Sequence, residues 1–220
     1  MRDQRDDCCA ADPRIARHFD GDMRRHAEAG TFPEMVAVSQ GLLELLSDVG
    51  EQRPTLLELG CGSGALTVEL VKRGAIAADG VDLSSGSIEL AQRRAAEAGV
   101  AERTRFQVGD GAQVSVEPHD WVVMDRVICC YRHVDRLLEN ATSAAQNRVI
   151  FSVPQQWGWR GIVNRLIVTV ENATNRFRGR PCPGYVHSIP NIERRLTDAG
   201  FRRVRSETFG LWYAAVFERS

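Results

Sequence analysis

The sequence LLELGCGSG, residues 56–64, places three glycines at alternate positions directly after a short apolar run. Glycine costs backbone entropy, so such a cluster marks a turn with positive φ or a place where a ligand approaches the backbone. The apolar run before it and the periodic segment after it predict a strand, a turn and a helix. This is the local geometry of a nucleotide-type pocket, which several classes of cofactor use.

From residue 55 onward the pattern alternates between strand and helix. The expected strands cover 55–59, 76–82, 104–109, 120–127 and 147–153. The expected helices between them cover 64–73, 84–98 and 133–146. Gly74 and Gly99 stand where helices should end, and Ser84 or Ser85 can cap the helix that begins there. This alternation predicts an α/β fold with a mostly parallel, Rossmann-like sheet that binds its ligand beyond the carboxyl ends of the strands.

The flanking segments follow other patterns. Two N-terminal helices are expected over 13–29 and 33–49, the second beginning at Pro33. A further helix over about 158–176 and an Arg- and Pro-rich loop interrupt the alternation. After a helix over 190–199, two last strands, 201–208 and 211–218, are joined by little more than Gly210, so they should form an antiparallel hairpin.

The length of 220 residues predicts one domain. We divide it into four parts: a helical cap (1–53), a binding core (54–153), a helical lid (154–186), and a C-terminal helix with the hairpin (187–220).

Composition narrows the class of function. A net charge of −1 gives no electrostatic reason to expect a nucleic-acid partner. The charged N-terminal sequence lacks the apolar region of a secretory signal and no stretch is long enough to span a bilayer, so a cytoplasmic protein without stable membrane insertion is expected. The six cysteines lack zinc-ligand spacing, so no metal site is predicted.

The glycine turn alone leaves the cofactor open. Gly60, Gly62 and Ala65 satisfy the relaxed dinucleotide fingerprint, and Asp82 lies where a carboxylate would accept hydrogen bonds from ribose hydroxyls. An NAD-binding oxidoreductase therefore stays an alternative. A second acidic residue after the third strand, Asp110, and the terminal hairpin argue against it.

Four motifs in order, LLELGCGSG, GVDLS, VGDG and WVVMDRV, resemble the class I S-adenosylmethionine (SAM) dependent methyltransferases over about residues 30–218. The resemblance implies SAM as cofactor and S-adenosylhomocysteine as product. It places Glu58 at the methionine amino group, Asp82 at the ribose and Leu83 on the adenine. The other implied cofactor contacts are the turn residues Gly60, Cys61, Gly62 and Gly64, the adenine-edge residues Asp110 and Gly111, and Asp125 and Arg126 near the sulfonium.

The C-terminal third is similar to one group of these enzymes. GYVHSIPNIERRLTDAGF, residues 184–201, resembles the C-terminal region of magnesium-protoporphyrin IX methyltransferases. DRVICCYRH at 125–133 departs from that family, because Cys129 or Cys130 replaces its histidine and Arg132 its proline. We therefore expect a bacterial relative that methylates an oxygen or nitrogen of another small molecule, with a porphyrin-type carboxyl O-methyltransferase as the alternative. A nucleic-acid methyltransferase and a SAM-binding module without catalysis are further alternatives.

Candidate catalytic residues follow from the need to align donor and acceptor and, for a phenol or amine, to remove a proton. His133, His187 and Tyr131 are the catalytic candidates, although either histidine also fits a helix start. The candidates for acceptor binding are His18, His26, Trp157 and Tyr185. Helical spacing places Trp159 in the core. The apolar face over 159–170 also fits a membrane contact, which its few basic residues disfavour.

Overall fold

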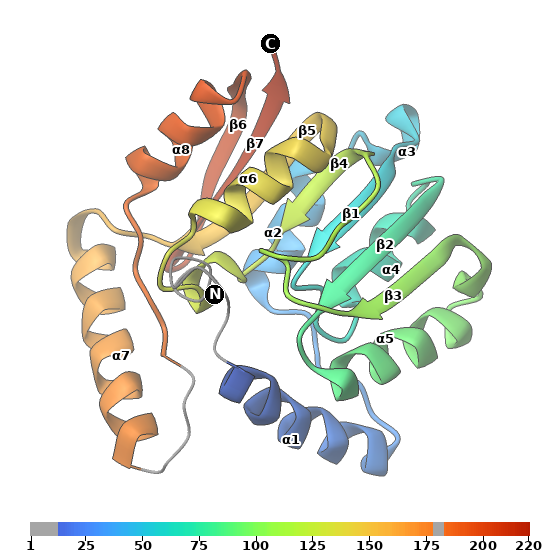
Figure 1. Cartoon of the computed structure of the whole chain (residues 1–220), viewed down its shortest axis with the longest axis horizontal. Coiled ribbons are helices and arrows are strands. Elements are labelled where there is room, and N and C mark those ends of the chain that lie inside the picture. The colour runs from blue at the N-terminus through green and yellow to red at the C-terminus, as the bar shows by residue number, and fades with distance from the viewer. Residues whose placement is uncertain (1–12, 178–182) are drawn as a thin grey trace, which may run out of the picture.

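The computed structural model describes residues 13–177 and 183–220 of the chain (Figure 1). Its strands form one seven-stranded sheet in the order β3-β2-β1-β4-β5-β7-β6. The strands are β1 Thr55–Leu59, β2 Ala77–Asp82, β3 Thr104–Val108, β4 His119–Met124, β5 Ala145–Pro154, β6 Phe201–Phe209 and β7 Trp212–Arg219. The first five are parallel, and β7 is antiparallel to both β5 and β6. The predicted fold class, with its terminal hairpin, is confirmed.

Helices cover both faces of this sheet. The longer helices are α1 Pro13–Ala29, α2 Ala37–Leu45, α4 Ala65–Lys72, α5 Ser85–Glu97, α6 Asp135–Ala144, α7 Gly158–Phe177 and α8 Ile189–Asp198. A core cluster on one face joins α6 and α8 to the sheet, and a second cluster joins α2, α4 and α5 to the other face. Alternation along β1 makes this possible, because Leu57 and Leu59 belong to the first cluster and Leu56 to the second. Figure 1 shows α6 and α8 in front of the sheet and α1 across its lower end.

The second N-terminal helix differs from the sequence prediction. Residues 31–36 are not helical, α2 begins only at Ala37, and a separate short helix, α3, covers Val49–Gln52. The segment before α2 is attached to α5 instead. The ring of Phe32 lies beneath the guanidinium groups of Arg93 and Arg94, and Arg94 Nη2 donates to the carbonyl of Pro33 at 3.0 Å. These tertiary contacts outweigh the local preference for a helix start at proline.

The predicted helix over 158–176 is present as α7, but its apolar side does not enter the core. Trp159, predicted to be interior, is 63% exposed. The reason is that α7 attaches to the rest of the molecule through amide side chains, with Asn164 Nδ2 donating to the carbonyls of Gln155 and Leu211, each at 2.8 Å. No helix of the described ranges is both long and apolar enough to cross a membrane.

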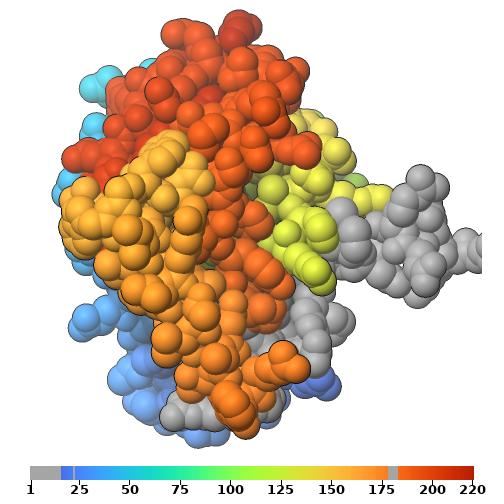
Figure 2. Space-filling view, turned by 90° about the vertical axis from the view of Figure 1, so that its left-hand side faces the viewer, coloured from blue at the N-terminus to red at the C-terminus, as the bar shows by residue number. Residues whose placement is uncertain are grey.

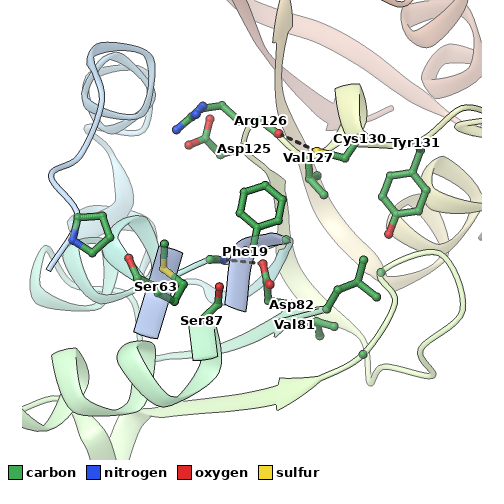
Figure 3. A pocket seen from close by; sticks show the side chains of 17 residues that line it. Phe19, Ser63, Val81, Asp82, Ser87, Asp125, Arg126, Val127, Cys130 and Tyr131 are labelled. Carbon is green, nitrogen blue, oxygen red and sulfur yellow. Dashed lines mark hydrogen bonds between the residues drawn. The ribbon is translucent and has the colours of Figure 1, made fainter. Parts of the chain in front are cut away.

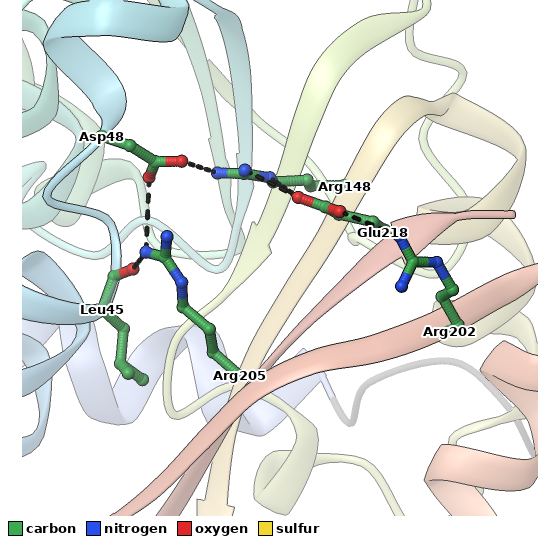
Figure 4. A network of polar contacts seen from close by, with 6 residues as sticks. All are labelled: Leu45, Asp48, Arg148, Arg202, Arg205 and Glu218. Carbon is green, nitrogen blue, oxygen red and sulfur yellow. Dashed lines mark hydrogen bonds and ion pairs between the residues drawn. The ribbon is translucent and has the colours of Figure 1, made fainter.

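A buried arginine connects three parts of the fold (Figure 4). Arg148 of β5 donates through Nε and Nη2 to Glu218 Oε1 of β7, at 2.9 and 2.7 Å. Its Nη1 lies 2.8 Å from Asp48 Oδ2 in the turn between α2 and α3, as an ion pair without hydrogen-bond alignment. Arg205 of β6 reaches the other Asp48 oxygen at 3.6 Å. The network therefore fixes the N-terminal helices against the antiparallel end of the sheet.

Candidate active site

The glycine turn after β1 has the backbone that its sequence predicts. Gly60, Gly62 and Gly64 have φ of 79°, 51° and 70°, a region that favours glycine. A side chain at Gly60 would meet Val127, because a Cβ there would lie 2.4 Å from Val127 Cγ2. The turn therefore needs glycine both for its conformation and for its close contact with the segment after β4.

The backbone donors of this turn are engaged within the protein. The N–H groups of Gly60 and Cys61 donate to the carbonyl of Val81, and Gly64 donates to the carbonyl of Cys61. The N–H of Gly62 donates to Asp82 Oδ2 at 2.9 Å. A dinucleotide pocket offers such N–H groups to a pyrophosphate. Here four of them are already hydrogen-bonded, one of them to a carboxylate.

Asp82 ends β2 and lies beside the glycine turn. Its second oxygen, Oδ1, accepts from the N–H of Ser84 at 2.9 Å, so both oxygens are oriented by backbone donors. Burial raises the pKa of Asp82, and the two backbone hydrogen bonds oppose that shift. Each carboxylate oxygen can accept a second hydrogen bond, so the group remains able to bind a ligand hydroxyl.

Two further carboxylates lie near the same turn, Glu58 buried and Asp125 half-buried. Burial raises the pKa of Glu58 to about 8, and the negative charges of Asp125 and Asp82 add to the increase. Glu58 Oε2 accepts a hydrogen bond from Thr67 of α4. Burial likewise raises the pKa of Asp125, whose oxygens accept from Ser152 at 2.5 Å and from Ser39. The negative charges of Asp125 and Asp82 act on Glu58, so this region is electrostatically suited to a cation.

Asp110 and Tyr131 form a pair on the other side of the turn. The Tyr131 hydroxyl donates to Asp110 Oδ1 at 2.6 Å, and the N–H of Ala112 donates to the same oxygen. Burial, followed by the charge of Asp110, raises the pKa of Tyr131 well above its usual range. Tyr131 is therefore a hydrogen-bond donor that orients Asp110, and its place among the catalytic residues stays a prediction.

These groups surround a cavity of about 220 Å³ at the carboxyl ends of β1, β2 and β4 (Figure 3). Eight predicted site residues line it: Gly60, Gly62, Asp82, Leu83, Gly111, Asp125, Arg126 and Tyr131. Four others, Glu58, Cys61, Gly64 and Asp110, do not line it. Glu58 and Asp110 act on lining residues through the charges and the hydrogen bond given above, whereas Cys61 is buried and its sulfur lies close to Gly80.

Helix α1 closes the cavity from outside the sheet, through side chains that the sequence analysis did not name. Phe19 and Met23 of α1 line it, and Figure 3 shows the Phe19 ring between Asp82 and Asp125. The helix is held there by Asp20, whose Oδ1 accepts from Ser84 Oγ at 2.6 Å and from the N–H of Gly86 at 3.1 Å. Asp20 of α1 thus provides a hydrogen-bond acceptor for donors at the start of α5. The cap signal at Ser84 was visible in the sequence, but its partner 64 residues away was not.

Other lining residues were also missed. They are Pro33, Ser63, Val81, Ser87, Gly109, Val127 and Cys130. Most of them lie next to a predicted residue in the sequence. The motifs therefore indicated which segments form the walls of the cavity, but not every side chain that lines it. Arg126 has an unusual backbone, with φ of 58°, and its guanidinium lies 5.5 Å from the centre of the Trp212 ring. A positive φ is uncommon for arginine, and such strain is typical of functional sites.

The predicted histidines do not line this cavity. His133 is exposed in the loop before α6. His187 is half-buried, and its Nε2 lies 2.9 Å from the carbonyl oxygen of Tyr131. Burial lowers the pKa of His187. His187 thus attaches the segment before α8 to the loop after β4.

The predicted acceptor-binding residues are likewise dispersed among other contacts. His26 Nδ1 lies 3.0 Å from Thr31 Oγ1, and the His18 ring contacts Phe19. Trp157 packs edge-on against Tyr213, and Tyr185 stacks near His187. None of the four lines the cavity. Their roles, like those of the histidines, stay predictions.

Comparisons with known proteins agree with this geometry. Residues 56–148 match the family model of a methyltransferase domain. This match covers 93 of the 220 residues, and over that range the chain is similar to methyltransferases. The matched range contains the glycine turn, Asp82, Asp110, Asp125 and Tyr131.

Two relatives and one crystal structure are similar to this chain. A chloroplastic magnesium protoporphyrin IX methyltransferase of Arabidopsis thaliana is 27% identical over 168 residues, covering 75% of this chain and 52% of that protein. A magnesium-protoporphyrin O-methyltransferase of Rhodobacter capsulatus is 32% identical over 100 residues, 44% of each chain. This chain therefore spans about half the length of these relatives.

The crystal structure is that of the magnesium protoporphyrin IX methyltransferase of Synechocystis PCC 6803 with bound S-adenosylhomocysteine. It has a TM-score of 0.72 at 21% identity, and the match covers 95% of this chain and all of that one. The likeness establishes that both chains share the class I methyltransferase fold.

Proposed function

We propose that this chain is a SAM-dependent methyltransferase that transfers a methyl group to an oxygen or nitrogen of a small-molecule acceptor. One observation carries the proposal: the buried carboxyl group of Glu58 and the half-buried carboxylates of Asp82 and Asp125 lie around a glycine turn in which four backbone N–H groups are already hydrogen-bonded. Buried carboxylates with raised pKa values favour a ligand that brings positive charge. SAM carries an ammonium and a sulfonium, so the residues present fit it.

Each wall residue has a distinct role in this proposal. SAM, when bound, supplies a methyl group that its sulfonium activates for displacement. Glu58 and Asp125 stabilise the cationic groups, and Asp82 accepts from the ribose hydroxyls. Leu83 and Tyr131 enclose the adenine side. Phe19 and Met23 of α1 exclude water, which matters because methyl transfer depends mainly on alignment and on a dry site.

The rival dinucleotide function fits less well. A pyrophosphate placed at this turn would meet Asp82 and Asp125, which line the cavity, and four N–H groups that are already hydrogen-bonded. Bringing an anion next to these carboxylates is costly. The same residues that favour SAM therefore disfavour NAD.

We propose the class of the acceptor from the residues that line the cavity. The cavity has no histidine among its described lining residues. This supports an acceptor atom that is already ionised, such as a carboxylate, because a phenol or an amine would have to lose a proton. Magnesium protoporphyrin, named for two relatives, is one candidate of the carboxylate kind.

The test is an endpoint assay of S-adenosylhomocysteine formation. The chain would be incubated with SAM and a panel of carboxylate, amine and phenol acceptors, including magnesium protoporphyrin. Acceptor-dependent product that disappears in the Asp82→Ala variant supports the proposal. SAM binding with no turnover on any class would instead favour a binding module without catalysis. The cytoplasmic and bacterial assignments stay predictions from the sequence.

A further inference from the structure

Helix α7 packs against the molecule with its polar side and exposes its apolar side, the opposite of an ordinary surface helix. Its inward side is small and polar: Gly161 and Asn164 are buried, and Asn172 exchanges two hydrogen bonds with the backbone of Gly184, at 3.0 and 2.8 Å. Gly161 lies so close to the preceding loop that a Cβ there would meet the Gln156 carbonyl at 2.0 Å. The helix is thus fixed in its orientation by contacts that apolar residues do not make.

The outward side carries the large apolar residues. Trp159, Ile162, Leu166 and Val170 are each 61–63% exposed and recur at intervals of three and four residues. We call these four residues, together with Ile167 and Phe177, the α7 stripe. Phe177 at the end of the helix is 92% exposed. Large apolar side chains that gather on one exposed face of a folded chain mark a binding surface. Figure 2 shows α7 on the outer face of the molecule, in amber and orange.

From the sequence alone, the few basic residues of this helix disfavour a membrane contact, but the outward position of the α7 stripe changes that balance, and the charges beside it favour an anionic partner. Helix α7 contains three arginines, Arg160, Arg165 and Arg176, and a single acidic residue, Glu171. The whole chain, by contrast, has a net charge of −1. At 100° per residue, Arg165 and Arg176 lie on one flank of the stripe and Arg160 on the other. Tryptophan at one end and arginines along the flanks are the composition of a helix that lies in the interface of an anionic bilayer.

We propose that the α7 stripe docks the enzyme on an anionic lipid membrane, with the helix lying in the headgroup region. A second copy of the chain is a poorer occupant, because pairing two α7 helices would bring six arginines against two glutamates. In this proposal the helix lies parallel to the membrane surface. This inference goes beyond the methyl-transfer proposal, and its test needs neither SAM nor an acceptor.

The experiment is flotation of the full chain with phosphatidylcholine vesicles and with vesicles that also contain phosphatidylglycerol. We expect cofractionation with the anionic vesicles that weakens at high salt. Leu166→Ser should lower the partition coefficient about tenfold, because it removes apolar area from the stripe. The matched control is Ile76→Ser, at a half-exposed apolar residue outside α7, which should leave the partition unchanged.

A second readout locates the contact. Lipids brominated on their acyl chains should quench tryptophan fluorescence, and Trp159→Phe should lose most of that quenching while still floating. Absence of flotation with anionic vesicles, or equal flotation of Leu166→Ser and the native chain, would overturn the proposal. So would a dimer in sedimentation equilibrium that Leu166→Ser dissociates, since the stripe would then bind a second copy.

Discussion

The Asp82 carboxylate accepts a hydrogen bond from the backbone N–H of Gly62 at 2.9 Å, connecting the end of β2 to the glycine turn. This contact both shapes the turn and occupies a donor that a phosphate would need. It makes Asp82 the residue whose replacement should most directly separate a cation-binding site from a dinucleotide site.

Asp82→Ala should weaken SAM binding by about 2 kcal/mol, roughly thirtyfold in Kd, because it removes an acceptor and frees the Gly62 N–H. Calorimetric titration measures the change. The control is Asp79→Asn on the same strand, whose carboxylate faces His119 at 3.3 Å and does not line the cavity. Equal loss of affinity in both variants would mean that the effect reflects β2 rather than the pocket.

Glu58 should make SAM binding depend on pH. Its pKa is raised to about 8, so at neutral pH the carboxyl is mainly protonated in the free protein. A bound ammonium favours the ionised form, so binding should release a proton and tighten as the pH rises toward about 8. Titrations in buffers of different ionisation enthalpy count that proton. In Glu58→Gln the count should fall, and an unchanged count would contradict the assignment.

Stability should respond to the same residue with the opposite sign. A carboxyl whose folded pKa lies above its unfolded value contributes stability at low pH and loses it as the pH rises through the folded value. From about pH 4.5 to pH 8 the native chain should therefore lose free energy of unfolding relative to Glu58→Gln. Urea denaturation of both proteins across this range measures the difference. A gap that stays constant with pH would show that the pKa is not raised.

Tyr131→Phe tests whether the hydroxyl orients Asp110 or acts as a base. Loss of its 2.6 Å hydrogen bond should weaken SAM binding by about 1 kcal/mol and leave the pH profile of kcat unchanged. Steady-state kinetics across pH separates the two effects. A collapse of kcat with normal SAM affinity would support the base instead.

The Arg148 network should contribute to stability rather than to binding. Arg148→Ala leaves Asp48 and Glu218 without their buried partner and should cost about 3 kcal/mol of unfolding free energy. Arg202→Ala removes a weaker, exposed contact to Glu218 at 3.8 Å and should cost less than about 1 kcal/mol. Urea denaturation measures the free energy of unfolding of both variants. Similar losses in the two would show that the burial of Arg148 does not strengthen its contribution to stability.

The sheet was predictable because its signals are local. Each strand of the parallel half is a short apolar run, and Gly74, Gly99 and Gly200 adopt positive φ where helices end, as their spacing indicates. The start of α2 was not predictable, because Pro33 is held by Arg94, a residue 61 positions away. The local sequence around Pro33 does not reveal such a long-range contact.

The candidate site likewise has a part that the sequence predicts and a part that it does not. The motif residues Gly60, Asp82 and Asp125 follow strands, so the topology alone brings them together. The walls from α1 depend on Asp20 reaching Ser84, a pairing between distant segments that no periodicity reports. The α7 stripe was recognised as an apolar face, but only the structure shows that its polar face is the one that packs inward.

The most direct test of the central claim is a parallel calorimetric titration of the native chain with SAM and with NAD. We expect micromolar binding of SAM, about −8 kcal/mol, and no heat from NAD. Binding of NAD without binding of SAM up to roughly millimolar concentration, about −4 kcal/mol, would contradict it.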